Sequence, residues 1–194
     1  MTSEKHSQRK LIKQRRNALV ASDINHASKK IAQRLWKIPA MQRAKRVAIY
    51  MSAGGEIDCA PILKTAWLRK IDTFAPILAG KKLIFAPLNK QTQTTPNQYR
   101  ILEPVYSHRH CVQAKHLDVV IVPLVAFDKH GNRLGMGGGF YDRSFAFTKH
   151  RQKSRRPLLI GVAYDFQRVD ALLAEPWDVR LHAVITDKES YGSC

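Results

Sequence analysis

The stretch LDVVIVPLVAF, residues 117–127, is continuously apolar and rich in β-branched residues. This pattern is typical of a strand that is covered on both faces. Helical segments separate the other strand-like stretches, which are VAIYMS (47–52), LIFAPL (83–88), LLIGVAY (158–164) and HAVIT (182–186). Strands that alternate with helices form parallel sheets with helices on both faces. The sequence therefore predicts one three-layer α/β/α domain, residues 1–194, with a mainly parallel sheet.

Two helices are expected before the first strand. Residues 7–19 form a basic helix that is only weakly amphipathic. The second helix follows Ser22 and Asp23 as its N-cap and ends before Pro39. Its apolar stripe, which we expect to face the core, consists of Ile24, Ala27, Ile31 and Leu35. A further helix begins near Asp58.

Three remaining segments have weaker patterns. Residues 89–97 are polar without periodicity, which predicts a mobile surface loop. Residues 99–104 are compatible with a short edge strand, and residues 149–156 form a charged loop.

The chain is strongly basic, because 33 Lys and Arg residues oppose 15 Asp and Glu residues among 194, a net charge of +18. Residues 1–46 contain 13 of the basic residues and two acidic ones, a net charge of +11, and we expect this helical part to pack on the sheet. An apolar fraction of 44% excludes a disordered chain. The charge implies an anionic partner and leaves nucleic acid, a membrane surface and a nucleotide open.

The cysteines and the hydropathy pattern indicate the compartment. Cys59, Cys111 and Cys194 are widely separated, which excludes a disulfide framework and a four-cysteine zinc site. No apolar run approaches the roughly 20 residues of a membrane span, and no signal-peptide core is present. We therefore expect a cytoplasmic protein without a membrane partner; the early arginines leave a mitochondrial presequence open.

A glycine-rich segment, FDKHGNRLGMGGGFYDR at 127–143, directly follows the most apolar strand. Four glycines within 135–139 allow backbone N–H groups to converge on a phosphate. Arg133 and Arg143 flank them as candidate phosphate ligands, and Asp142 offers a hard oxygen for Mg²⁺. Neither a P-loop nor a complete G-x-G-x-x-G is present. The segment predicts a phosphate site, with a flexible glycine turn as the alternative.

The run RLGMGGGFYDR, preceded by PLVAFDxxG, closely resembles the signature of the 5-formyltetrahydrofolate cyclo-ligase family. The likeness extends over most of the chain. Further similar elements are Lys5 with Arg9, Arg16 with Ala18 and Leu19, and residues 51–58, 161–165, 175–179 and 184–186. Only residues 71–116 resemble the family weakly.

The resemblance implies a fold like that of the NagB/RpiA/CoA-transferase group and a carbon–nitrogen ligase reaction. In this reaction 5-formyltetrahydrofolate and MgATP give 5,10-methenyltetrahydrofolate, ADP and phosphate. The formyl oxygen takes the γ-phosphoryl group, N10 attacks the formyl carbon, and phosphate leaves. The resemblance also implies a monomer that acts on reduced folates, including polyglutamylated forms, without a specific nucleic acid.

The resemblance also assigns residues. It implies ATP contacts for Lys5, Arg9, Arg133, Leu134, Gly135, Met136, Gly137, Gly138, Gly139, Phe140 and Tyr141. It implies folate contacts for Met51, Glu56, Met136, Gly137, Gly138, Gly139 and Phe140. Arg133, Tyr141 and Asp142 are implied as catalytic, and Asp142 and Asp178 as Mg²⁺ ligands. Gly138 stands where many family members have lysine, so Arg133, Arg143 or the basic N-terminus must supply that charge.

Two other hypotheses remain. His108, His110, Cys111 and His116 form a possible metal cluster, although the spacing matches no zinc module and favours a surface loop. The second is a basic nucleic-acid-binding protein without catalytic activity, which predicts steeply salt-dependent binding. That hypothesis leaves the glycine segment and Asp142 unexplained.

Overall fold

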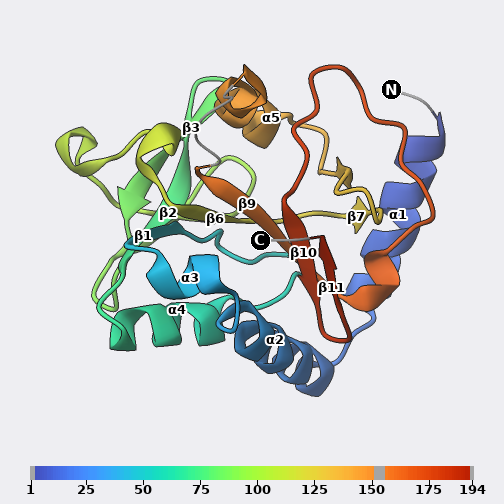
Figure 1. Cartoon of the computed structure of the whole chain (residues 1–194), viewed down its shortest axis with the longest axis horizontal. Coiled ribbons are helices and arrows are strands. Elements are labelled where there is room, and N and C mark those ends of the chain that lie inside the picture. Colours follow the sequence, from blue (N-terminus) through green and yellow to red (C-terminus); the bar gives the residue numbers. More distant parts are fainter. Residues whose placement is uncertain (1–2, 151–155, 193–194) are drawn as a thin grey trace.

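The structure, a computed structural model, describes residues 3–150 and 156–192. Within these residues a seven-stranded sheet lies at the centre, in the order β11-β10-β9-β6-β1-β2-β3 (Figure 1). Its strands are β1 (Arg46–Ala48), β2 (Asp72–Ala79), β3 (Lys82–Pro87), β6 (Val119–Val122), β9 (Leu158–Ala163), β10 (Ala183–Thr186) and β11 (Ser190–Gly192). All neighbours from β10 to β2 are parallel, and β11 and β3 are antiparallel edge strands. The predicted α/β fold with a mainly parallel sheet is confirmed.

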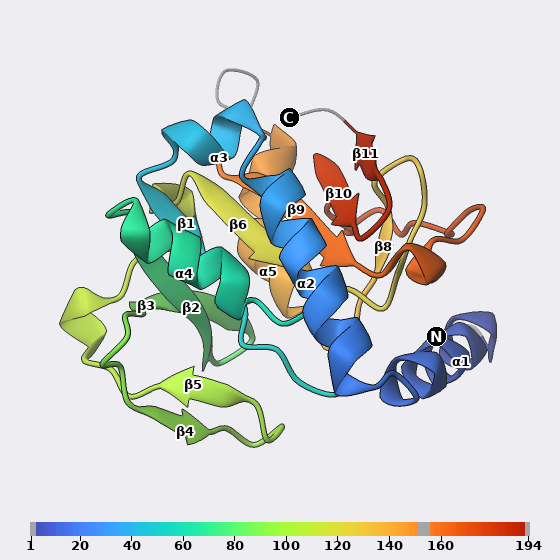
Figure 2. The same cartoon turned by 90° about the horizontal axis from the view of Figure 1, so that it is seen from below.

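Helices cover both faces of the sheet, as Figure 2 shows from a second direction. One face carries α2 (Ala21–Leu35), α3 (Pro39–Arg43) and α4 (Ala60–Leu68). The other face carries α5 (Phe140–Phe145) and the following 3₁₀ turn η3 (Ala146–His150). No described helix combines the length and apolarity that crossing a membrane requires.

The alternating side chains of β6 explain its continuous apolar sequence. Val119 and Ile121 belong to the core cluster beneath α2 and α4, whereas Val120 and Val122 belong to the cluster beneath α5. All four are at most 1% exposed. Both faces of this strand are therefore buried, as the sequence predicts.

The stretch 117–127 is not one strand, and this is a correction. β6 ends at Val122, and β7 (Ala126–Phe127) pairs with β8 (Arg133–Leu134) in a separate two-stranded sheet. Pro123 lies between them and has no N–H group to continue the ladder. The chain therefore leaves the central sheet at the carboxyl end of β6, which places the glycine segment beyond that edge.

The N-terminal helices differ from expectation in two details: α1 spans residues 3–17 instead of 7–19, and α2 has a different N-cap. α2 begins at Ala21 with Val20 as its N-cap and has no side-chain capping bond, so the Ser22/Asp23 cap was wrong. Its predicted stripe does face the core, because Ala27, Ile31 and Leu35 are buried and Ile24 is partly buried. α1 (Ser3–Asn17) contacts β7, at one side of the central sheet (Figure 1).

The middle of the chain departs furthest from the prediction. β2 was not predicted, and β4 (Thr94–Pro96) lies in a segment that was predicted as loop. It pairs with β5 (Leu102–Pro104), which falls within residues 99–104, the possible short edge strand. The first predicted strand ends at Ala48, and α4 begins at Ala60, where Asp58 Oδ1 accepts a hydrogen bond from the Ala60 N–H at 2.9 Å. The predicted charged loop falls largely on residues 151–155, outside the described residues.

Candidate functional site

A cavity of about 980 Å³ opens at the carboxyl edge of the parallel strands. α1, the turn after β1, the β2–β3 hairpin, the glycine segment and residues 172–178 form its walls. Every residue with a predicted site role lines this one cavity: Lys5, Arg9, Met51, Glu56, Arg133, Leu134, Gly135, Met136, Gly137, Gly138, Gly139, Phe140, Tyr141, Asp142 and Asp178. Segments that are up to 170 residues apart therefore meet at one site, as in the bond between Lys5 and Glu175.

The glycine segment owes its shape to left-handed residues and to one arginine. Gly137 and Gly139 have φ values of +105° and +62°, and α5 begins directly after Gly139. Arg143 donates hydrogen bonds to the carbonyl oxygens of Gly138 and Lys81. Arg143 thus braces the loop through two carbonyl groups, a role that its sequence position alone does not reveal.

Gly138 gives space to an aromatic ring. A Cβ atom at Gly138 would lie 2.7 Å from the Phe140 ring. The ring also meets Tyr99 edge-on, with centroids 6.1 Å apart, and Arg143 lies 5.3 Å from its centroid. Gly138 and Phe140 therefore act as a matched pair in this chain. Tyr99, which lines the cavity, lies in the weakly resembling part and was not predicted as a site residue.

Gly139→Ala is expected to lower the free energy of unfolding by about 1–2 kcal/mol, the cost of a left-handed residue with a Cβ atom. Its new Cβ would also lie 2.7 Å from Arg143 Nη1. Gly135→Ala is the matched control, because a Cβ there meets nothing within 4 Å. Chemical denaturation of both variants checks this, and equal stabilities would contradict it.

Arg133 and Asp142 form a clamp between the glycine segment and the chain near Val179. Arg133 Nη2 lies 2.8 Å from Asp142 Oδ1, with side-chain exposures of 5% and 20%. Arg133 also donates to the Val179 carbonyl oxygen, and the Val179 N–H donates to Asp142 Oδ1 at 3.0 Å. Asp178 Oδ2 accepts from the Glu175 N–H at 2.9 Å. One oxygen of Asp142 is therefore already engaged by a cation and an amide.

α1 brings two cations to the cavity. Lys5 Nζ lies 3.0 Å from Glu175 Oε1, and Arg9 Nε donates to the Gly135 carbonyl oxygen at 2.8 Å. Arg9 Nη1 is buried and has no hydrogen-bond partner among the described residues. Burial lowers the pKa of Arg9 from its ordinary value. A poorly solvated cation with a free donor is suited to an anionic group of a ligand.

Glu56 lies on the turn after β1, where its carboxylate meets α1. Ala53 N–H donates to Glu56 Oε2 at 3.2 Å, and Arg16 Nη1 lies 3.5 Å from Oε1. Burial raises the pKa of Glu56, and the charge of Arg16 opposes this rise. Sequence reasoning gave Arg16 no role in the site. The available signal was the spacing of Lys5, Arg9 and Arg16, which lie on one helical face.

Tyr141 is a neutral group in this site. Burial raises its pKa above the ordinary range, so the phenol keeps its proton at neutral pH and can donate a hydrogen bond.

The predicted histidine and cysteine cluster is divided between the turns η1 (His108–His110) and η2 (Ala114–His116). Within residues 3–150 and 156–192, no group of three or more His, Cys, Asp or Glu side chains is arranged to hold a metal.

Comparisons with known proteins agree with this geometry. The sequence model of the 5-formyltetrahydrofolate cyclo-ligase family matches residues 1–187. The 5-formyltetrahydrofolate cyclo-ligase of Escherichia coli is 36% identical over 179 residues, which cover 91% of this chain and 96% of the relative. The Haemophilus influenzae enzyme of the same name is 33% identical over 189 residues, 95% of this chain and 99% of the relative.

A solved structure is similar throughout. The 5,10-methenyltetrahydrofolate synthetase of Aquifex aeolicus superimposes with a TM-score of 0.80 at 29% identity, over 97% of this chain and 92% of that protein. The family match, residues 1–187, spans α1, the glycine segment, β9 and β10, and ends before β11. The chain therefore belongs to the 5-formyltetrahydrofolate cyclo-ligase family.

Proposed function

We propose that this chain uses ATP to cyclise 5-formyltetrahydrofolate to 5,10-methenyltetrahydrofolate, with release of ADP and phosphate. The observation that carries the proposal is one cavity, in which partly buried cations and a glycine loop adjoin an apolar wall. The cations suit a triphosphate, and Leu78, Leu83 and Leu124 on the apolar wall suit a ring system. Two different substrates can thus be held side by side.

The reaction needs activation because a formyl group on nitrogen is a weak electrophile. Its oxygen bonds to the γ-phosphorus as the bond to ADP breaks, N10 then attacks the formyl carbon, and the C–O bond breaks as phosphate leaves. N10 gives up its proton in this step, and the departing phosphate takes it up. The protein must orient both substrates and stabilise charge on the phosphoryl group.

The described side chains divide this work. Lys5, Arg9 and the N–H groups of the glycine loop hold the phosphates, and Arg133 faces the phosphoryl group in transfer. The neutral phenol of Tyr141 donates a hydrogen bond to a bound substrate. Glu56 accepts hydrogen bonds from the folate ring, with Met51 and Met136 in apolar contact.

Asp142 and Asp178 are the residues that would hold Mg²⁺. The fit is supported by the chemistry of the donors, since Mg²⁺ commonly takes one or two carboxylates together with substrate phosphates. Both carboxylates line the same cavity. The ion would neutralise charge on the phosphates of ATP. Because Asp142 Oδ1 is engaged by Arg133, its second oxygen is the natural ligand.

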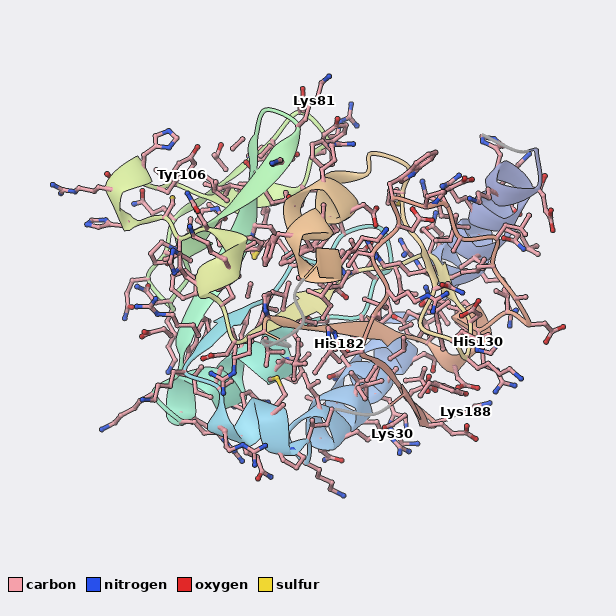
Figure 3. All side chains as sticks on the ribbon, turned by 45° about the horizontal axis from the view of Figure 1, so that its top comes forward. Lys30, Lys81, Tyr106, His130, His182 and Lys188 are labelled. Atoms are coloured by element: carbon pink, nitrogen blue, oxygen red, sulfur yellow. The ribbon has the colours of Figure 1, made fainter. Side chains whose placement is uncertain are left out.

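The excess charge has a place in this proposal. A positive field raises the local concentration of polyanions, and both ATP and polyglutamylated folates are polyanions. The alternative of a nucleic-acid-binding protein without catalytic activity does not account for the cavity. Figure 3 shows Lys81 and Lys30 on opposite sides of the molecule, so these two basic side chains do not belong to one continuous basic surface.

The direct test mixes the purified chain with 5-formyltetrahydrofolate and MgATP and follows the absorbance of the methenyl product. We expect product to accumulate with one ADP per turnover, and no product when ATP is left out. Folded protein that yields no product at high enzyme concentration would refute the proposal.

A further inference from the structure

One face of α1 reaches three separate walls of the cavity. Positions 5, 9, 12 and 16 are spaced by four, three and four residues and therefore share one side of the helix. Lys5 and Arg9 contact the walls that we assign to ATP, and Ile12 is buried against the β7–β8 strands. Arg16 ends the face at the turn 53–56. The same helix thus touches the proposed nucleotide and folate ends.

The turn is built around Arg16. Its side chain is 2% exposed, and its Nη2 donates to the Gly54 carbonyl oxygen at 2.8 Å. Nη1 lies 3.5 Å from Glu56 Oε1, while Ala53 N–H holds Oε2. A Cβ atom at Gly55, where φ is +70°, would lie 2.8 Å from the Arg16 carbonyl oxygen. The backbone approaches the helix this closely because position 55 is glycine.

A contribution to the stability of the fold is a poor explanation for an arginine buried at position 16. Its Nε and Nη1 are buried and make no hydrogen bond to any described residue, because the 3.5 Å contact with Glu56 is an ion pair without hydrogen-bond geometry. Buried donors that lack partners are unfavourable, and a buried ion pair is weak support for a stabilising role. Arg16 contacts the carboxylate of Glu56, and Glu56 lines the cavity.

We propose that Arg16 is a positioning residue, which acts through Glu56 to fix the carboxylate that the folate contacts. This inference rests on the function proposed above. Arg16 itself does not line the cavity, whereas Glu56 is 14% exposed and does. With Ala53 holding one oxygen and Arg16 the other, the carboxylate has one defined orientation.

The charge of Arg16 also governs when Glu56 ionises. Burial raises the pKa of Glu56, and Arg16 and then Lys13 oppose the rise. The other facing titratable groups are neutral, and burial raises the pKa of each; they are Tyr50, Cys59, Tyr141 and Tyr164. Removing Arg16 therefore raises the pKa of Glu56 further. The carboxylate is then protonated, and folate binding lost, at a higher pH than in the parent protein.

The test compares Arg16→Met, Arg16→Lys, Glu56→Gln and the double variant Arg16→Met/Glu56→Gln. We expect Arg16→Met to raise KM for the folate about tenfold, to leave KM for ATP unchanged, and to move the acidic limb of kcat/KM to higher pH. Arg16→Lys should recover part of the loss. In the Glu56→Gln background, Arg16→Met should add nothing. Arg15→Met is the control, since Arg15 is exposed and stacks on Phe166 outside the cavity.

Two outcomes would overturn the inference. Additive losses in the double variant, or equal rises in KM for ATP and folate, would mean that Arg16 only holds α1 in place. If Arg16→Met does not fold, Arg16→Lys in both backgrounds decides the question by the same comparison. The proposed function fails separately, if the parent protein forms no methenyl product.

Discussion

Asp142→Asn is expected to lower kcat about a thousandfold, which is the scale seen when one preorganised electrostatic group is removed from an active site. The substitution removes the charge that pairs with Arg133 at 2.8 Å and the carboxylate that we assign to Mg²⁺. The asparagine side-chain oxygen can still accept the Val179 N–H, so the local backbone should persist. Single-turnover assays with MgATP measure the loss, and thermal unfolding checks the fold.

Asp118→Asn is the matched control for this prediction. Asp118 pairs with Arg156 at 2.7 Å and is 18% exposed, close to the 20% of Asp142, yet it lies at the other end of β6, before Val119. Its variant should turn over normally. A Mg²⁺ titration separates the two roles of Asp142, because only loss of a metal ligand raises the Mg²⁺ concentration needed for half-maximal rate. Turnover of Asp142→Asn within tenfold of the parent would contradict the assignment.

Local patterns were sufficient to predict five of the seven strands of the described central sheet, all except β2 and β11. The continuous apolar run of β6 reflects burial on both faces, since alternate residues enter the two core clusters. The stripe of α2 likewise follows from helical spacing. These features depend on neighbours within a few residues, and the sequence carries them directly. The glycine segment was identified for the same reason, because left-handed positions favour glycine wherever they occur.

β2 was missed because Pro76 stands in the middle of the strand. Proline normally argues against an inner strand. Here β1 pairs only as far as Phe74, and beyond that residue the Leu78 N–H donates to Glu103 Oε1 instead of to β1. The missing N–H group of Pro76 therefore costs no hydrogen bond to β1. That β2 can accept a proline here is evident only from the short length of β1. The sequence instead predicted that β1 continues to residue 52.

The contacts of the cations could not be predicted from local patterns. Arg143 stood beside the glycines as a candidate phosphate ligand, but its side chain binds the carbonyl groups of Lys81 and Gly138. Arg16 was part of a basic helix and proves to be buried against Glu56. Both outcomes depend on distant turns, since Gly54 is 38 residues from Arg16 and Lys81 is 62 residues from Arg143. The basic residues behind the net charge of +18 thus include some, such as Arg143 and Arg16, that bind specific groups within the protein.

Arg9→Ala is expected to raise KM for ATP by about 10–100-fold, the equivalent of losing one or two charge-assisted hydrogen bonds to phosphate. Nε holds the Gly135 carbonyl oxygen, whereas Nη1 is buried without a partner among the described residues and is free to bind an anion. Because an unpartnered buried donor is unfavourable, the substitution should cost little stability. KM for the folate should change less than KM for ATP, since Glu56 and Met51 lie on another wall.

Lys10→Ala is the control for Arg9→Ala, because Lys10 is the next residue of α1 and is exposed. It removes the same charge from the same helix and should leave KM for ATP unchanged. If both variants raised KM equally, the general positive field would explain ATP binding, and the assignment of Arg9 to the phosphates would fail. If only Arg9→Ala does so, and equilibrium binding of a non-hydrolysable ATP analogue weakens in parallel, the loss belongs to a direct contact. A general field acts over a longer range than a direct contact, and adjacent side chains that point about 100° apart around one helix separate the two explanations.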